Sequence, residues 1–305
     1  MLGGGFIRKP LLFFTLVLIP LFSFSFISGS LGVSLFGDLG LPDWLSVSKP
    51  ALHLPAEVVF RILGFPVTNT IIASWLSIIF LVGISYAITR RMKLVPSRWQ
   101  IILEFVIIWL LNFCQSVAGE QNGRRFFPIV ATIFLFVLAN AWLSLLPGFG
   151  SHFLRGANTD INLPLALALV SFVFVEYFGL KSHGLRYLRK FFNIGQFLNG
   201  IGQLFKGRFK AGFSELFAGL INIFVGLLEG LSEIVRIVSF TARLFGNMTA
   251  SEILLLIVAF LVPWVLALPF YGLELLVGLV QALIFGGLTL VFVTVAVAPH
   301  EAEAH

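Results

Sequence analysis

Long uncharged runs alternate with short charged segments along most of the chain. Residues 10–37, 62–89 and 126–154 carry no Asp, Glu, Lys or Arg, and residues 161–180 carry only Glu176. Each run is long enough for a helix that crosses the hydrocarbon core of a membrane, which takes about 20 residues. The pattern therefore predicts an all-α, polytopic membrane protein.

The segment 98–118 differs because polar residues interrupt its apolar surface, namely Arg98, Gln100, Glu104, Asn112 and Gln115. A helix that lies along the membrane surface fits this polar content better than a crossing helix. We therefore expect one membrane-surface helix beside the transmembrane helices.

The C-terminal stretch 216–298 is the longest apolar part of the chain. Its charged residues are Glu229, Glu233, Arg236, Arg243, Glu252 and Glu274. Pro263 and Pro269 bracket the predicted break, because proline lacks the helix donor and clashes with the preceding turn. Two helices result, roughly 217–261 and 270–297.

The first of these two helices would be about 67 Å long at about 1.5 Å per residue. That is about twice the thickness of the hydrocarbon core. The helix must therefore be strongly tilted or bent. The pattern predicts a long, strongly tilted C-terminal hairpin over about 217–298.

Composition excludes an ordinary soluble enzyme and a disordered chain, since 58% of the 305 residues are hydrophobic and only 11% are charged. Soluble domains carry about 25% charged residues. The one cysteine, Cys114, cannot form an internal disulfide, and no Cys/His cluster has metal-ligand spacing. With no phosphate-binding glycine loop either, we expect no metal, no cofactor and no nucleotide site.

Basic residues are distributed unevenly between the predicted loops. If 98–118 lies on the surface and each other run crosses once, only Lys49, Arg61 and Arg155 fall on one side. The other side holds Arg8, Lys9, Arg90, Arg91, Lys93, Arg98, Arg124, Arg125, Lys181, Arg186, Arg189, Lys190, Lys206, Arg208 and Lys210. The positive-inside rule then places loop 181–210 and the C-terminus in the cytoplasm. This asymmetry explains the net charge of +6 better than nucleic-acid binding does.

Residues 1–60 are predicted to form an N-terminal extension, and residues 61–305 the main membrane domain. Arg8 and Lys9 precede an apolar run and the small residues 28–30, an arrangement that resembles a signal peptide. We interpret the run as an uncleaved anchor helix, with a cleaved signal peptide as the alternative.

Arg243 lies near the middle of the first hairpin helix and has no acidic residue at i±3 or i±4. An ionisable group at membrane depth costs several kcal/mol and usually marks an ion or substrate pathway. A long basic side chain avoids this cost by reaching to the membrane surface only when it lies near a helix end. We therefore expect the partner anion of Arg243 to lie on another protein. Ser239, Asn247 and Arg236 share its helix face.

The two hairpin helices can be aligned from the sequence. If they run antiparallel, facing residues share a midpoint, and the pairs Arg243/Gln281 and Glu252/Glu274 both centre on the predicted break. Two facing carboxylates at low dielectric cannot both stay ionised cheaply, so one should hold a proton near neutral pH. The alignment predicts a proton or cation relay.

The run from Ser239 to Glu252, SFTARLFGNMTASE, closely resembles the signature of subunit a of bacterial F-type ATP synthases. Glu229–Ser232 and Gln281–Phe285 also resemble this family. Upstream, Leu145–Pro147 is similar to the end of the family's third helix, and Thr159–Leu163 to the start of its fourth. The resemblance covers about residues 65 to 298.

The resemblance implies a proton-translocating stator subunit that offers two half-channels to a rotating c-ring. Arg243 matches the family's essential arginine, which faces the ring carboxylate. Glu252, Glu274 and Gln281 match the channel opposite the cytoplasm, whereas the positions toward the cytoplasmic channel are Ser239, Asn247, Arg236 and Glu229. The implied partners are the c-ring, b-type subunits of the peripheral stalk and membrane lipid, in the bacterial inner membrane. Such a subunit is not an enzyme on its own.

Several assignments stay open at this point. Glu176 is either a channel residue or a paired residue of the bundle, and Asp160 and Asn162 are further candidate polar positions. The basic loop 181–210 fits either anionic lipid or a stator subunit. The alternative function is a secondary transporter whose midplane arginine binds an anionic substrate.

The charge distribution makes a testable prediction about topology. After replacement of Cys114, single cysteines in 181–210 should react with a membrane-impermeant thiol reagent from the cytoplasmic side of oriented vesicles. Cysteines in 147–160 should react from the opposite side. Labelling of 181–210 from outside would overturn the assignment.

Overall fold

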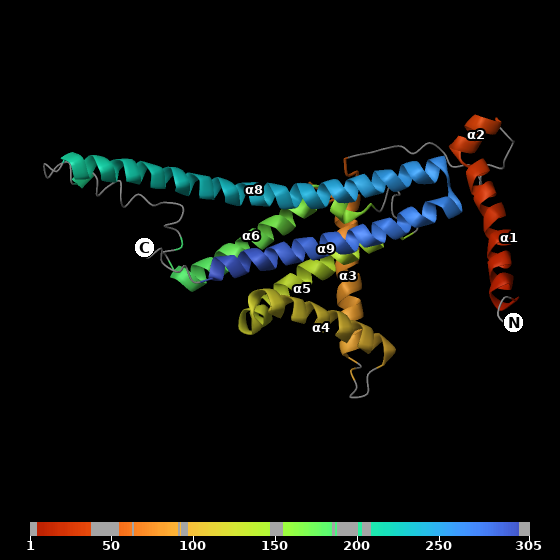
Figure 1. Cartoon of the computed structure of the whole chain (residues 1–305), viewed down its shortest axis with the longest axis horizontal. Coiled ribbons are helices and arrows are strands. Elements are labelled where there is room, and N and C mark those ends of the chain that lie inside the picture. The colour runs from red at the N-terminus through yellow and green to blue at the C-terminus, as the bar shows by residue number, and fades with distance from the viewer. Residues whose placement is uncertain are drawn as a thin grey trace. The chain divides into compact units, whose positions relative to one another are not determined.

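The computed structural model describes residues 5–37, 55–62, 64–90, 92, 97–146, 155–184, 187, 201–202 and 209–298. Helices dominate this part of the chain (Figure 1). In chain order the elements are α1 (Gly5–Ser28), α2 (Ser30–Phe36), β1 (Val58–Ile62), β2 (Phe65–Thr68), α3 (Asn69–Thr89), α4 (Arg98–Ala118), α5 (Glu120–Leu143), η1 (Ala157–Thr159), α6 (Asn162–His183), α8 (Phe209–Leu261), η3 (Trp264–Ala267) and α9 (Leu268–Val297). The predicted helical class is confirmed.

Six helices of the described part are long and apolar enough to cross a membrane: α3, α4, α5, α6, α8 and α9. Many of their large apolar side chains are exposed, as expected for surfaces that face lipid. Because α4 meets the same criteria of length and composition, its position on the membrane surface stays a prediction. The chain is a multi-pass membrane protein.

One short antiparallel hairpin, β1–β2, precedes α3 and was not predicted from the sequence. Its register pairs Arg61 with Pro66 and Ile62 with Phe65. Gly64 lies in the turn with a φ of 86°, a backbone conformation that glycine adopts without strain.

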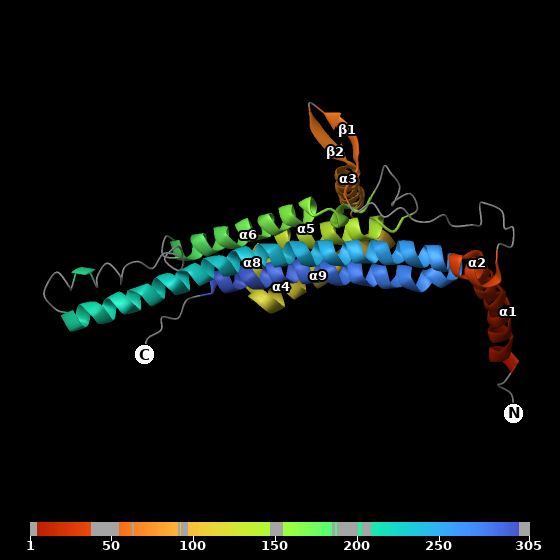
Figure 2. The same ribbon diagram turned by 90° about the horizontal axis from the view of Figure 1, so that it is seen from above.

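The long C-terminal helices follow the predicted pattern, with α8 beginning eight residues before the expected start. α8 ends at Leu261, Pro263 follows, and η3 leads into α9. Pro269 falls in the first turn of α9, where its missing N–H removes no helix hydrogen bond. The break at Pro263 is therefore confirmed, and each long helix continues without interruption on its side of it (Figure 2).

Backbone contacts divide the chain into two compact units. Unit 1 comprises 1–77, 138–160 and 246–281, and unit 2 comprises 78–137, 161–245 and 282–305. Helices α3, α5, α8 and α9 each contribute residues to both units.

Unit 2 has a core of aromatic and aliphatic side chains from α4, α5, α6 and α9. Phe126 and Phe174 pack edge to face at 6.1 Å, and each also contacts Phe178. A buried hydrogen bond of 2.7 Å joins the hydroxyls of Ser171 and Thr289, so it ties α6 to α9. Further members of this core are Cys114, Val130, Val175, Leu290, Val293 and Ala296.

Antiparallel packing of α8 against α9 is visible in unit 2. The ring of Phe240 lies 5.0 Å from that of Phe285 and 5.7 Å from that of Phe292. These pairs have midpoints close to Pro263, as the sequence alignment of the hairpin requires.

Unit 1 is held by close backbone approach and by polar contacts between helices. A Cβ at Gly278 would lie 2.8 Å from the Cβ of Ala141, so α9 approaches α5 as closely as a glycine permits. The indole N–H of Trp142 donates to the carbonyl of Leu275 at 3.1 Å. Small residues allow this kind of helix contact in membranes, where apolar burial supplies little driving force.

The N-terminal helix reaches the turn of the hairpin within the same unit. The Ser25 hydroxyl donates to the carbonyl of Pro263, and the backbone N–H of Leu266 donates to the Ser25 hydroxyl at 3.4 Å. Gly29 lies against the carbonyl of Leu261, where a side chain would not fit. The turn between α8 and α9 thus has polar partners on α1.

The close contact at Gly278 makes a prediction for stability. Gly278→Ala should lower the melting temperature of the purified protein by several degrees, because overpacking costs about 1–3 kcal/mol. Gly272→Ala is the matched control on the same helix, since nothing lies within 4 Å of a Cβ at Gly272. Equal melting temperatures for the two variants would contradict the tight α5–α9 contact.

Candidate functional site

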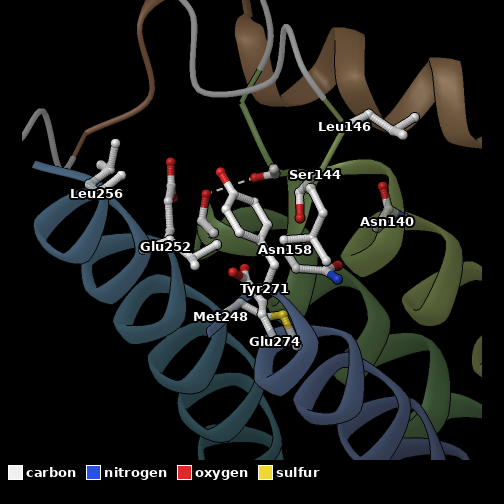
Figure 3. Close-up of a pocket in the computed structure, with 14 residues that line it drawn as sticks. Asn140, Ser144, Leu146, Asn158, Met248, Glu252, Leu256, Tyr271 and Glu274 are labelled. Carbon is white, nitrogen blue, oxygen red and sulfur yellow. Dashed lines mark hydrogen bonds between the residues drawn. The ribbon is translucent and has the colours of Figure 1, made fainter. Parts of the chain in front are cut away.

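A cavity of about 160 Å³ lies in unit 1, among the end of α5, η1, the last turns of α8 and the start of α9. It has room for several water molecules. Its polar lining residues are Asn140, Ser144, Asn158, Thr159, Glu252, Tyr271 and Glu274 (Figure 3). Leucines complete the wall together with Met248 and Ala259. A space with polar lining residues and room for water therefore lies between otherwise apolar helices.

Glu252 reaches this cavity from α8 and is paired with Arg155. The Nε of Arg155 lies 3.2 Å from both carboxylate oxygens, and its Nη2 lies 3.2 Å from Oε2. Arg155 is 8% exposed and the Glu252 side chain is 22% exposed, so the pair is only partly shielded from bulk solvent. Charge-assisted contacts of this kind are among the strongest polar interactions in proteins.

Glu274 reaches the same cavity from α9, one turn beyond Tyr271 (Figure 3). The residue is buried, and its Oε2 has no hydrogen-bond partner among the described residues. Glu252 and Glu274, which the hairpin midpoint predicts to face each other, thus line one cavity. The environments of the two carboxylates differ, because Glu252 has the Arg155 guanidinium beside it.

A second, more open groove of about 400 Å³ lies further along the hairpin in unit 1. Asn247 and Gln281 are its two amide side chains, and Gln281 is buried whereas Asn247 is exposed. Arg243 belongs to unit 2 and Gln281 to unit 1, so their predicted proximity stays a prediction.

Arg243 is exposed on α8, whereas its neighbours Phe240 and Leu244 are buried. Among the described residues it has no ion-pair partner. It lies in a strip of exposed residues that are otherwise small, which we call the exposed strip: Ser239, Ala242, Arg243, Gly246, Asn247 and Ala250. Small residues let another helix come close, and they leave the guanidinium accessible to it.

Arg236, unlike Arg243, has an ion-pair partner among the described residues. Its Nη1 lies 2.6 Å from Oε2 of Glu233, one helical turn away, and its guanidinium lies 3.9 Å from the ring centre of Phe292. Glu229 is half-buried on the same helix. These predicted site residues belong to unit 2.

The remaining candidates have partners in the fold. Glu176 accepts a hydrogen bond of 3.2 Å from the Tyr187 hydroxyl, which fits the second of its two alternatives, a paired residue of the bundle. Asp160 accepts a hydrogen bond of 2.8 Å from Thr70. Asn162 is the exposed first residue of α6. None of the three lines the cavity.

Arg155 is the site residue that the sequence did not reveal. It was assigned only as one of three basic residues on the sparsely charged side. The small number of basic residues on that side was the available signal, because a single cation there can form an ion pair with Glu252 or Glu274. Within the described residues, no group of three or more His, Cys, Asp or Glu could hold a metal ion.

The fold and site define a helical membrane protein with acidic and basic groups inside a long hairpin. The family profile described as ATP synthase A chain matches residues 71–294, and the chain therefore belongs to the family of subunit a of F-type ATP synthases. The chain is 32% identical over 237 residues to ATP synthase subunit a of Gloeobacter violaceus, a match that covers 76% of this chain and 85% of the relative. For ATP synthase subunit a of Geobacter sp. (strain M21), identity is 33% over 225 residues, covering 74% and 86%. The Moorella thermoacetica subunit is 26% identical over 249 residues, covering 81% and 99%.

The placement of the acidic residues makes a prediction for conduction. Glu252→Gln should lower passive proton conduction through the membrane sector by about fivefold or more, because it removes one of the two carboxylates that line the cavity and the anion beside Arg155. Glu229→Gln is the comparison, because it removes an acid from the same helix outside the cavity and should have the smaller effect. Equal effects, measured as proton uptake into vesicles, would argue against a relay at the cavity.

Proposed function

We propose that this chain is the proton-conducting stator subunit of an F-type ATP synthase and forms two offset half-channels against a c-ring. The observation that carries the proposal is Arg243. It is an exposed cation in a strip of small residues, with no acidic partner among the described residues. A partner carboxylate on a neighbouring protein would satisfy it.

The outer half-channel begins at the cavity that Glu252 and Glu274 line. A proton enters from the water outside, passes these two acidic residues and protonates the carboxylate of the ring. That carboxylate becomes neutral, so it can move into lipid at low cost. Gln281 and Asn247 line the second groove of the same unit, and Asn247 stands between Arg243 and Glu252 in the sequence.

The cytoplasmic half-channel uses residues nearer the start of α8. After almost a full turn, the ring carboxylate releases its proton near Ser239, Arg236 and Glu229. Arg243 then attracts the ionised carboxylate across a region of low dielectric, where Coulomb attraction is strong. Its fixed charge also repels protons that would pass directly between the two half-channels.

Arginine suits this task because its guanidinium stays protonated in proteins and is only weakly hydrated. The catalytic chemistry of ATP then belongs to other subunits of the complex. The further partners are b-type subunits of the peripheral stalk and membrane lipid, in the inner membrane of a bacterium. The C-terminus and loop 181–210 face the cytoplasm in this proposal, and residues 1–60 are an N-terminal extension that includes an uncleaved anchor helix. A secondary transporter has less support, since the polar residues gather in one hairpin and the chain shows no internal repeat.

The role of Arg243 is tested by substitution. Arg243→Ala should abolish ATP-driven proton pumping in inverted vesicles while passive proton leak persists or rises, because both the attraction and the barrier are lost. Arg243→Lys should also fail or be severely impaired, since it keeps the charge without the broad guanidinium. Placing Gln at 243 and Arg at 281 together should restore more pumping than Arg243→Gln alone.

All variants are compared at equal amounts of assembled complex. Normal pumping by the Arg243→Ala variant would show that Arg243 is a structural residue at the membrane surface. The proposed mechanism would then be wrong.

A further inference from the structure

Arg155 is an unusual residue for its position in the chain. It stands just before η1, on the side of the membrane predicted to carry few basic residues, and it is buried rather than solvated. Two of its guanidinium nitrogens lie 3.2 Å from the carboxylate of Glu252, which is 97 positions further along the chain. A contact between such distant segments is specific to the folded protein.

The contact makes the two carboxyl groups of the cavity unequal. A guanidinium remains charged in proteins, and an adjacent carboxylate is therefore stabilised as an anion. Glu274 has no such partner, since its buried Oε2 makes no hydrogen bond to any described residue. Tyr271 is the remaining titratable residue that lines the cavity.

We propose that Arg155 is a positioning residue of the proton pathway, holding Glu252 as a fixed anion so that Glu274 is the carboxyl group that takes up the proton. This inference rests on the proposed function, because it assigns separate tasks to the two acids of the outer half-channel. The Arg155–Glu252 pair carries no net charge, so Glu274 is left as the carboxyl group of the cavity that binds and releases a proton.

Charge balance predicts how the pair responds to substitution. Removal of one partner from a buried ion pair leaves an uncompensated charge, whereas neutral replacement of both partners costs much less. Without Arg155, the Glu252 anion opposes ionisation of Glu274 and slows proton release. Without Glu252, the positive charge of Arg155 near the cavity is less compensated and favours the anionic form of Glu274. Both single changes therefore impair proton transfer through the same acid.

The experiment measures passive proton conductance of membranes that carry the whole complex, after removal of its nucleotide-binding sector. Arg155→Gln and Glu252→Gln should each lower conductance by about fivefold or more, in line with an uncompensated buried charge. The double variant Arg155→Gln/Glu252→Gln should conduct better than either single variant. Arg155→Lys should retain most of the conductance, because it keeps the charge.

Two comparisons make the result specific. Arg61→Gln removes another basic residue from the same predicted side, but Arg61 is exposed and should conduct like the wild type. Glu274→Gln should stay low even when Arg155→Gln is added, because the proton-accepting group itself is missing. If adding Arg155→Gln restores conductance to Glu252→Gln but not to Glu274→Gln, a general loss of structure cannot explain the result.

The outcomes separate this inference from the proposed function. If Glu252→Gln is impaired but Arg155→Gln conducts like the wild type, or if the double variant is worse than both single variants, the role of Arg155 is overturned and the channel stands. If Glu252→Gln, Glu274→Gln and Arg243→Ala all conduct and pump normally, the proposed function itself fails.

The measured conductance is divided by the amount of this chain that co-purifies with the ring. If Arg155→Gln does not assemble, Arg155→Lys and the double variant decide the question. The role is supported if Arg155→Lys retains most of the wild-type conductance and the double variant conducts better than Glu252→Gln. Any other result overturns it.

Discussion

A charged side chain at membrane depth is stable only when an opposite charge, a hydrogen bond or water meets it. This constraint explains the polar residues of the hairpin. Glu252 meets Arg155, and Arg236 meets Glu233 and the ring of Phe292. Arg243 meets no acid among the described residues and is exposed. The constraint that explains the pairs within the chain therefore leads us to expect that the partner of Arg243 lies on another protein.

The antiparallel arrangement of α8 and α9 gives this chemistry its order. Because both helices continue from the turn at Pro263, residues at equal distances from the turn come to the same level. Glu252 and Glu274 line one cavity, and Asn247 and Gln281 line a second groove of the same unit. The hairpin thus arranges polar groups in sequence along its length. A single long helix could not enclose them on two sides.

Close packing with α5 supplies the other wall of the cavity. Gly278 brings α9 against Ala141, and the neighbouring residues Asn140 and Ser144 line the space that Glu274 enters. The Asn140 side chain in turn accepts a hydrogen bond from Ser77 on α3 at 2.8 Å. These contacts fix the position of the α5 residues that line the cavity. Helix α1 adds a contact at the hairpin turn through Ser25, outside the residues that the family profile matches.

The sequence alone determined the helical membrane class, the break at Pro263 and the antiparallel register of the hairpin, because hydropathy and proline act locally. It also pointed to the family through the run around Arg243. Only the tertiary structure decided that Arg155 pairs with Glu252, that Glu176 bonds to Tyr187, and that a β-hairpin precedes α3. Such contacts depend on which distant segments fold together, and no local pattern of residues encodes that. The two acids of the cavity look alike in the sequence, and their surroundings in the fold make them different.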